Sequence, residues 1–402
     1  MEEWILKQVQ HDGNIALYVH WPFCVSKCPY CDFNSHVRAG IDQDAWREAL
    51  LADLAHEARL LPGRRLGSIF FGGGTPSLME PGTASAVIAA ARAYWPADEA
   101  IEITLEANPN SVEAARFADL AAAGVNRLSL GLQSFDDRAL AFLGRAHSAR
   151  EGFAALETAQ KHFRRVSFDL IYALPGESED GWSATLAQAL SLGTSHLSLY
   201  QLTIEPGTRF ASMVARGAFE PLDADAAAGL FELTDAMTSA AGVPAYEISN
   251  HARAGQQSRH NLTYWRYGDY AGIGPGAHGR RLGMRTVRHR KPENFLRGIV
   301  RNGHGLAEEA ALSQFEAGDE ALVMGLRLAE GVDAGALAAR FGLEAIVDWA
   351  RVERLVGSGH LERDGSRIAV TARGRLLLDA ILGEIAAPIS AAAEPMPESV
   401  PA

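Results

Sequence analysis

The alternation of short β-branched runs with longer alanine-rich runs constrains the fold of this chain most. Between residues 15 and 205 this alternation predicts repeated βα units around a parallel sheet. The expected strands lie at residues 15–20, 68–71, 101–105, 127–131, 166–171 and 196–201. The expected helices lie at residues 45–61, 83–94, 112–123, 137–142, 148–163 and 181–192. Six such units predict an α/β fold, a partial (β/α)6 version of the eight-stranded barrel.

The remaining segments predict an extension of this barrel and a second domain. Residues 206–304 contain an expected helix at 224–241, an expected strand at 245–249 and a glycine-rich segment that ends at residue 279. Residues 305–385 predict helices at 313–328, 333–341 and 344–358 and then a hairpin with Asp364-Gly365 at its turn, which resembles a winged-helix domain. Residues 1–14 form a short lead-in, and residues 386–402 predict a disordered tail.

All three cysteines of the chain lie on the loop after the first expected strand. Cys24, Cys28 and Cys31 have the spacing C-x3-C-x2-C. Three thiolates suit three irons of a [4Fe–4S] cluster and leave the fourth iron open. A disulfide would leave one thiol over, a closed zinc site usually takes four ligands, and three inert core cysteines rarely lie within eight residues. The spacing therefore favours a cluster over these alternatives.

The residues around the cysteines carry a family resemblance. Tyr18-Val-His-Trp-Pro-Phe-Cys24 and Cys31-Asp-Phe-Asn34 resemble the radical S-adenosylmethionine (SAM) superfamily. The similarity is strongest to the branch that holds oxygen-independent coproporphyrinogen III dehydrogenases and heme chaperones. It implies a radical SAM barrel in which the open iron is chelated by the amino and carboxylate groups of the methionine moiety of SAM.

Candidate SAM-binding residues lie where barrels carry functional groups, at the carboxyl ends of strands. The glycines before Thr75 would let the backbone approach a ligand and offer it free N–H groups. By resemblance, Gly73, Gly74 and Thr75 contact the methionine amino group and Tyr30 lies against the adenine. The resemblance also implies cofactor or substrate contacts for Tyr18, Glu106, Gln133, Arg145 and Asp169.

Simpler structural roles exist for the same residues. The glycine run could be only a tight turn, Tyr30 a packing aromatic and Glu106 a helix cap or surface acid. Arg145 and Asp169 could be partners in an ion pair, since an acid on an otherwise apolar strand needs one. We expect Tyr200, Gln201 and Glu205 to close the cavity after the sixth strand.

A second motif, His260-Asn261-Leu-Thr-Tyr264-Trp265, resembles the H-N-x-x-Y-W element of the heme chaperones. An imidazole can ligate heme iron, and Tyr264 and Trp265 could cover a porphyrin face. The alternative is a loop whose aromatic side chains only pack against the barrel.

Two functions fit the resemblance. The first is a heme chaperone that binds heme as cargo and transfers it to an acceptor hemoprotein, carrying a [4Fe–4S] cluster and SAM. The second is a coproporphyrinogen III dehydrogenase, a radical SAM enzyme that would need a reductant protein to cleave SAM. Phe33 stands where the dehydrogenase has a further cysteine, and the chain before residue 15 is too short for that enzyme's lid. Together with His260–Trp265 these features favour the chaperone, and we assign no catalytic residue.

A third function, a simple iron–sulfur electron carrier, needs only the cysteine loop and leaves Glu106 and Gln133 unexplained. The formal charge of −12, from 49 acidic and 37 basic residues, argues against a nucleic-acid partner. The sequence shows no secretory signal and no apolar run of about 18 residues. Unpaired cysteines fit a reducing cytoplasm, and peripheral contact with a membrane stays compatible with the composition.

Overall fold

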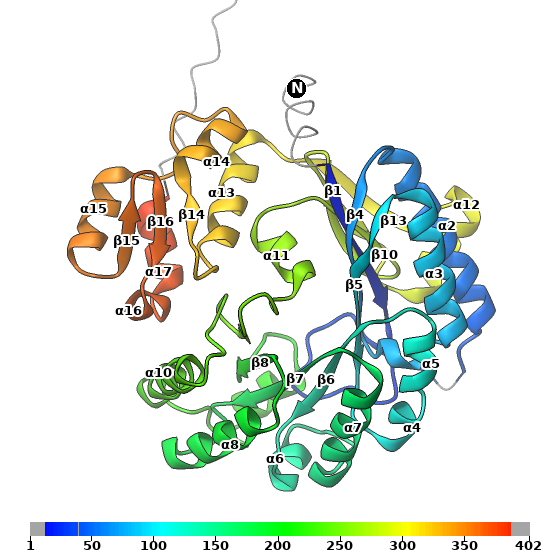
Figure 1. The fold of residues 1–402 in the computed structure, drawn as a ribbon, viewed down its shortest axis with the longest axis horizontal. Helices are drawn as coiled ribbons and strands as arrows, with labels where there is room; N and C mark the ends of the chain where they lie inside the picture. The colour runs from blue at the N-terminus through cyan, green and yellow to red at the C-terminus, as the bar shows by residue number, and fades with distance from the viewer. Residues whose placement is uncertain (1–12, 39, 387–402) are drawn as a thin grey trace, which may run out of the picture. The chain divides into compact units, whose positions relative to one another are not determined.

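The six predicted parallel strands form the centre of one curved sheet (Figure 1). The structure is a computed structural model that describes residues 13–38 and 40–386. Neighbouring strands pair in parallel, with Val19 opposite Phe71 and Phe71 opposite Leu105. The strands are β1 (Asn14–Trp21), β4 (Arg65–Gly73), β5 (Ala97–Ala107), β6 (Arg127–Gln133), β7 (Arg165–Tyr172) and β8 (His196–Gln201). The α/β barrel prediction is confirmed.

Further strands extend the sheet on both sides. β10 (Tyr270–Ile273) runs parallel to β1, and beyond it lie three antiparallel strands, β11 (His278–Arg281), β12 (Met284–Arg288) and β13 (Leu306–Ala311). At the other edge, β9 (Asn250–Ala252) is antiparallel to β8. Across the described residues this gives the order β13-β12-β11-β10-β1-β4-β5-β6-β7-β8-β9. A short parallel pair, β2 (Phe23–Cys24) and β3 (His36–Val37), flanks the cysteine loop.

Helices cover the convex face of the sheet (Figure 1). Their apolar sides and the outward side chains of the strands form the core, which includes Leu17, Trp95, Leu130 and Leu156. Asp42, Ser148 and Ser178 cap three of the helices, as expected for Asp and Ser at an N-terminus. The helices after the first strands are α2 (Gln43–Leu60), α3 (Pro81–Tyr94), α4 (Ser111–Ala114), α5 (Phe117–Ala122), α6 (Asp137–Phe142), α7 (Ala149–His162) and α8 (Glu179–Ser191). The chain before residue 312 also contains α9 (Arg209–Ala215), α10 (Ala224–Ala240), α12 (Pro292–Asn302) and the 3-10 helix η1 (Pro76–Leu78).

The concave side of the sheet is polar. Ser68, Ser129 and Ser167 are buried there, and Ser167 donates a hydrogen bond to Ser129. The short helix α11 (Arg259–Trp265) lies within the curve of the sheet (Figure 1), and its His260 is hydrogen-bonded to Ser68 at 3.0 Å. The inside of the barrel therefore offers polar groups rather than a second apolar core.

Several sequence-based elements need correction. The strand expected at 245–249 is wrong, because this segment turns back on itself through a hydrogen bond from the Tyr246 N–H to the Asn250 carbonyl, and pairing begins at β9. The helix expected at 112–123 is interrupted between α4 and α5. The glycine-rich segment that ends at residue 279, for which no helix or strand was predicted, contains α11, β10 and the start of β11.

The division into two compact units falls between Ala311 and Leu312, because β13 pairs with β12 in the larger sheet. The smaller unit contains α13 (Gln314–Gly325), α14 (Ala334–Phe341), α15 (Trp349–Gly357), α16 (Ala372–Arg375) and α17 (Leu378–Ile385). It also has a three-stranded sheet in the order β14 (Val332–Asp333), β16 (Arg367–Val370), β15 (Leu361–Asp364). The predicted hairpin is present, with Gly365 and Ser366 between its strands. Residues 387–402 of the predicted tail at 386–402 and most of the lead-in lie outside the described residues. Among the described helices, none is long and apolar enough to cross a bilayer.

Candidate functional site

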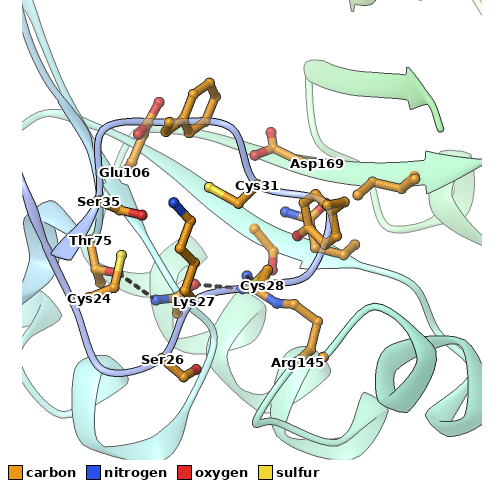
Figure 2. A pocket seen from close by; sticks show the side chains of 18 of the residues that line it. Cys24, Ser26, Lys27, Cys28, Cys31, Ser35, Thr75, Glu106, Arg145 and Asp169 are labelled. Atoms are coloured by element: carbon orange, nitrogen blue, oxygen red, sulfur yellow. Dashed lines mark hydrogen bonds between the residues drawn. The ribbon is translucent and has the colours of Figure 1, made fainter. Parts of the chain in front are cut away.

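A cavity of about 420 Å³ lies at the carboxyl ends of the parallel strands (Figure 2). The cysteine loop forms one wall, and the ends of β4, β5, β6, β7 and β8 form the others. Figure 2 shows Cys24, Cys28 and Cys31 bordering the same space as Glu106 and Asp169. The cavity lies at the strand ends, which is the position that the sequence predicted for the site.

The three cysteines are free thiols and half-buried. The Thr75 hydroxyl donates to Cys24 Sγ at 3.5 Å, and Arg145 Nη1 donates to Cys28 Sγ at 3.4 Å. Burial raises the pKa of Cys24 and of Cys31. Deprotonation of these thiols therefore requires a positive partner, which cluster irons supply.

The donor set fits a cluster better than a single ion. Within residues 13–38 and 40–386 no three His, Cys, Asp or Glu side chains converge closely enough to hold one metal ion. A [4Fe–4S] cluster instead takes each thiolate on a different iron. Cys24, Cys28 and Cys31 line one cavity without converging on a single point, as ligands of three different irons would.

The glycine run differs from the prediction in one respect. We expected free N–H groups, but Gly73 donates to Glu106 Oε2 at 3.2 Å, Gly74 to the Trp21 carbonyl and Thr75 to the Phe23 carbonyl. Gly74 is required by close packing, since a Cβ there would lie 2.7 Å from the Phe23 carbonyl oxygen. An ammonium group donates hydrogen bonds and therefore binds to acceptors, not to N–H groups. The engagement of these N–H groups is thus compatible with binding of the methionine amino group by this segment.

Two carboxylates face the cavity. Burial, and after it the negative charge of Asp169, raise the pKa of Glu106 to about 8, while the hydrogen bond from the Gly73 N–H acts against the shift. Burial also raises the pKa of Asp169 to about 6, against hydrogen bonds from Ser198 and Ser129. Both groups lack a cationic partner at bonding distance in the described residues, which suits a site that receives a positively charged or hydroxyl-rich ligand.

Arg145 and Asp169 are not bonded to each other, so the simpler alternative of an ion pair between them is not what the structure shows. Arg145 Nη2 donates to Asn108 Oδ1 at 2.5 Å and to the Gly131 carbonyl at 3.0 Å, whereas Asp169 accepts from the Ser129 hydroxyl at 3.4 Å. The loop after β6 turns the guanidinium toward the cysteine loop instead.

Unsatisfied polar atoms also point to a ligand. Gln133 has a positive φ of 67°, uncommon outside glycine. Its Oε1 atom and Arg145 Nε are buried and have no hydrogen-bond partner among the described residues. Buried polar atoms are almost always paired in a finished site, so this cavity fits a polar occupant such as the SAM nucleoside and amino-acid groups.

The predicted aromatic and closing residues separate into two groups. Tyr30, Tyr200, Gln201 and Glu205 line the cysteine cavity, as expected. Tyr18 does not. It lines an adjoining cavity of about 370 Å³, where its hydroxyl is hydrogen-bonded to His20 Nδ1 at 3.0 Å.

This second cavity also receives part of the H-N-x-x-Y-W element. Tyr264 lines it, whereas Asn261 and Trp265 are half-buried outside its lining. His260 is 1% exposed, and its ring nitrogens are hydrogen-bonded to Ser68 Oγ at 3.0 Å and to the Tyr264 hydroxyl at 3.1 Å. Burial lowers the pKa of His260 to about 3. An iron ligand role for His260, which remains a prediction, would require breaking one of these bonds.

Sequence reasoning missed three residues. Asn108 links the two walls of the cysteine cavity, since it donates to Thr75 Oγ1 at 3.1 Å and accepts from Arg145. Its place two residues after Glu106, just beyond the end of β5, could have indicated this. His278 and Arg290 line the second cavity, and no sequence signal placed them beside Tyr264.

Comparisons with known proteins agree with this geometry. The Radical SAM superfamily model matches residues 18–189, and the HemN C-terminal domain model matches residues 312–377. Heme chaperone HemW of Escherichia coli (strain K12) is 39% identical over 376 residues, which cover 92% of this chain and 97% of that protein. Radical S-adenosyl methionine domain-containing protein 1, mitochondrial, of Bos taurus is 44% identical over 328 residues, 79% of this chain and 74% of that protein.

A solved structure described as coproporphyrinogen III oxidase (HemN) from Escherichia coli, a radical SAM enzyme, has a TM-score of 0.78. It is 23% identical to this chain, and the match covers 95% of this chain and 92% of that one. At this identity the likeness establishes the fold.

Proposed function

Because the chain belongs to the radical SAM family of HemW heme chaperones, we propose that it binds heme and transfers it to acceptor proteins. The observation that carries this proposal is the second cavity, which brings Tyr264 of the H-N-x-x-Y-W element beside the cysteine cavity. The two cavities share Phe33, Gly73 and Glu106 in their walls. A cargo site next to a cofactor site is the arrangement that a regulated chaperone needs.

Membership of the radical SAM superfamily implies a [4Fe–4S] cluster and SAM. We assign Cys24, Cys28 and Cys31 as cluster ligands. When bound, the cluster supplies an open iron for the methionine moiety and a source of electrons. Around it, Arg145 and Thr75 hold the cysteine loop through hydrogen bonds to Sγ atoms.

The other cavity groups would bind SAM. Glu106 and Asp169 can accept hydrogen bonds from ribose hydroxyls or the methionine ammonium, and Gln133 offers an unpaired Oε1 acceptor. Tyr30 lines the same cavity and can lie on the adenine.

The partners follow from the same proposal. Heme is the cargo, and the receiver is a respiratory or other hemoprotein. A reductant protein is needed only if SAM is cleaved. We place this activity in the cytoplasm, with peripheral contact at a membrane where the acceptor resides there.

The test is a combined assay on cluster-reconstituted protein under anaerobic, reducing conditions with SAM. We expect saturable heme binding in the visible spectrum, transfer of that heme to an apo-hemoprotein, and unchanged coproporphyrinogen III. Absence of heme binding would contradict the chaperone function. Vinyl-bearing products from coproporphyrinogen III would instead establish the dehydrogenase.

A further inference from the structure

The second cavity has the chemistry of a site for a flat, anionic, iron-bearing ligand. Its walls carry the rings of Tyr18, Phe33, Tyr264 and Tyr270. Aromatic rings of this kind can face a planar macrocycle. Its rim carries Arg290, which is exposed. A heme in this cavity would need a side chain that can bind its iron.

Three imidazoles lie in or directly behind the cavity. His20 lines it, but Nδ1 is bonded to the Tyr18 hydroxyl at 3.0 Å and Nε2 to the Asn34 carbonyl at 2.9 Å. His260 lies behind Tyr264 with both nitrogens bonded, as described above. His278 lines the cavity with an exposed side chain, and its ring has no hydrogen bond to any described residue.

If the chain binds heme as proposed above, its iron needs a protein ligand, and we propose that His278 is this ligand and that Arg290 binds a heme propionate. Neutral imidazole is a common iron ligand. The planar guanidinium fork of Arg290 matches a carboxylate. Its side chain makes no hydrogen bond or ion pair with the described residues.

The backbone around His278 is built to hold it at the rim. A Cβ on Gly272 would lie 1.8 Å from the His278 carbonyl oxygen, so β10 and β11 approach each other closely only because glycine is there. Gly276 has a φ of +82°, and a Cβ there would lie 2.3 Å from Asn34 Nδ2. The glycines of the segment that ends at residue 279 therefore allow the close backbone packing that places His278.

Asn34 fixes the two proposed heme contacts relative to each other. Its Nδ2 donates to the Pro275 carbonyl and to the Arg290 carbonyl, both at 2.9 Å. The turn that leads into His278 and the backbone of Arg290 are thus tied to one side chain of the cysteine loop region. Such a tie fixes the spacing between a metal ligand and an anion partner.

His260 then becomes a positioning residue. Its Nε2 is bonded to the Tyr264 hydroxyl, so it sets the orientation of a ring that faces the heme rather than binding the iron. Replacing it should change affinity through Tyr264 while leaving the imidazole–iron bond in place.

The experiment is an anaerobic heme titration of full-length, cluster-reconstituted wild type, His278→Ala, His278→Met and His260→Ala, followed by absorption and electron paramagnetic resonance. His162→Ala, at an exposed site on α7, is the control. For His278→Ala we expect at least about tenfold weaker binding and loss of the imidazole-ligated spectrum, which added imidazole restores. His278→Met should retain heme with a thioether-type spectrum, and His260→Ala should keep imidazole ligation.

For Arg290→Gln we expect about tenfold weaker binding with the iron spectrum unchanged. Arg285→Gln, at an exposed position of β12, should bind as wild type does. An unchanged spectrum and affinity in His278→Ala would overturn the assignment, as would loss of imidazole ligation in His260→Ala alone. In either case wild-type heme binding would survive, whereas no binding by the wild type would remove the proposed function itself.

Discussion

Glu106 gives a quantitative test of the electrostatics of the cysteine cavity. Its pKa is raised to about 8 from an ordinary 4.5, chiefly by burial. Below pH 4.5 the carboxyl is protonated in the folded and the unfolded chain. Between pH 4.5 and 8 the unfolded chain has released this proton and the folded chain has not, so stability falls as pH rises. Glu106→Gln cannot ionise and escapes this loss.

The size of the effect follows from the width of that interval. About 3.5 pH units at about 1.36 kcal/mol each give an upper limit of about 5 kcal/mol. Because Glu106 is partly exposed to an open cavity, solvent screens part of this, and we expect about 2–3 kcal/mol at pH 8. The amide can still accept the hydrogen bond from the Gly73 N–H, so the substitution removes the charge with little change in shape.

The assay is urea unfolding of the full-length protein, free of cluster and SAM, at pH 5, 6, 7 and 8. The free energy of unfolding of Glu106→Gln should exceed that of wild type by an amount that grows with pH and levels off above pH 8. Glu99→Gln, on the exposed part of the same strand, is the control and should show no such trend. A difference that is independent of pH, or a less stable variant at pH 8, would refute the reasoning.

Two further predictions concern packing near and away from the site. Gly74→Ala would place a Cβ 3.0 Å from Cys24 Sγ and displace the cysteine loop, so the iron content after cluster reconstitution should fall. Gly82→Ala is the control, since no atom lies within 4 Å of its Cβ, and it should take up iron as wild type does. Arg288→Met leaves the buried carboxylate of Asp53 on α2 without its cation and removes one of the two cations that pair with Glu57, so it should lower the free energy of unfolding by about 3–5 kcal/mol in urea titrations. Arg285→Met on the same strand, exposed, should cost under about 1 kcal/mol, and equal losses for both would contradict the buried-pair argument.

The parallel core and the cysteine loop could be predicted because their signals are local. The strand that ends at Gln133 alternates Leu128, Leu130 and Leu132 with polar or small residues, and this period of two is typical of a strand. The spacing of Cys24, Cys28 and Cys31 restricts the chemistry without any knowledge of the fold. Glu106 and Asp169 were found because strand ends of parallel sheets meet at one edge.

The strands beyond β10 escaped prediction because the acidic side chains that neutralise their buried arginines are distant in sequence. β11 and β12 carry buried Arg281 and Arg288, which a sequence pattern assigns to solvent. These guanidinium groups are buried because Asp53 and Glu57 on α2 pair with them. Without that pairing neither strand looks like part of a core, and the cavity beside His278 could not be anticipated.

Phe33, Gly73 and Glu106 belong to the walls of both cavities, and a shared wall makes the two occupancies thermodynamically linked. Any ligand that displaces this shared wall in one cavity changes the free energy of binding in the other. Linkage requires the effect to be reciprocal: if SAM weakens heme binding by some factor, heme weakens SAM binding by the same factor. Cofactor supply would then set how firmly the cargo is held, with no need for SAM to be consumed.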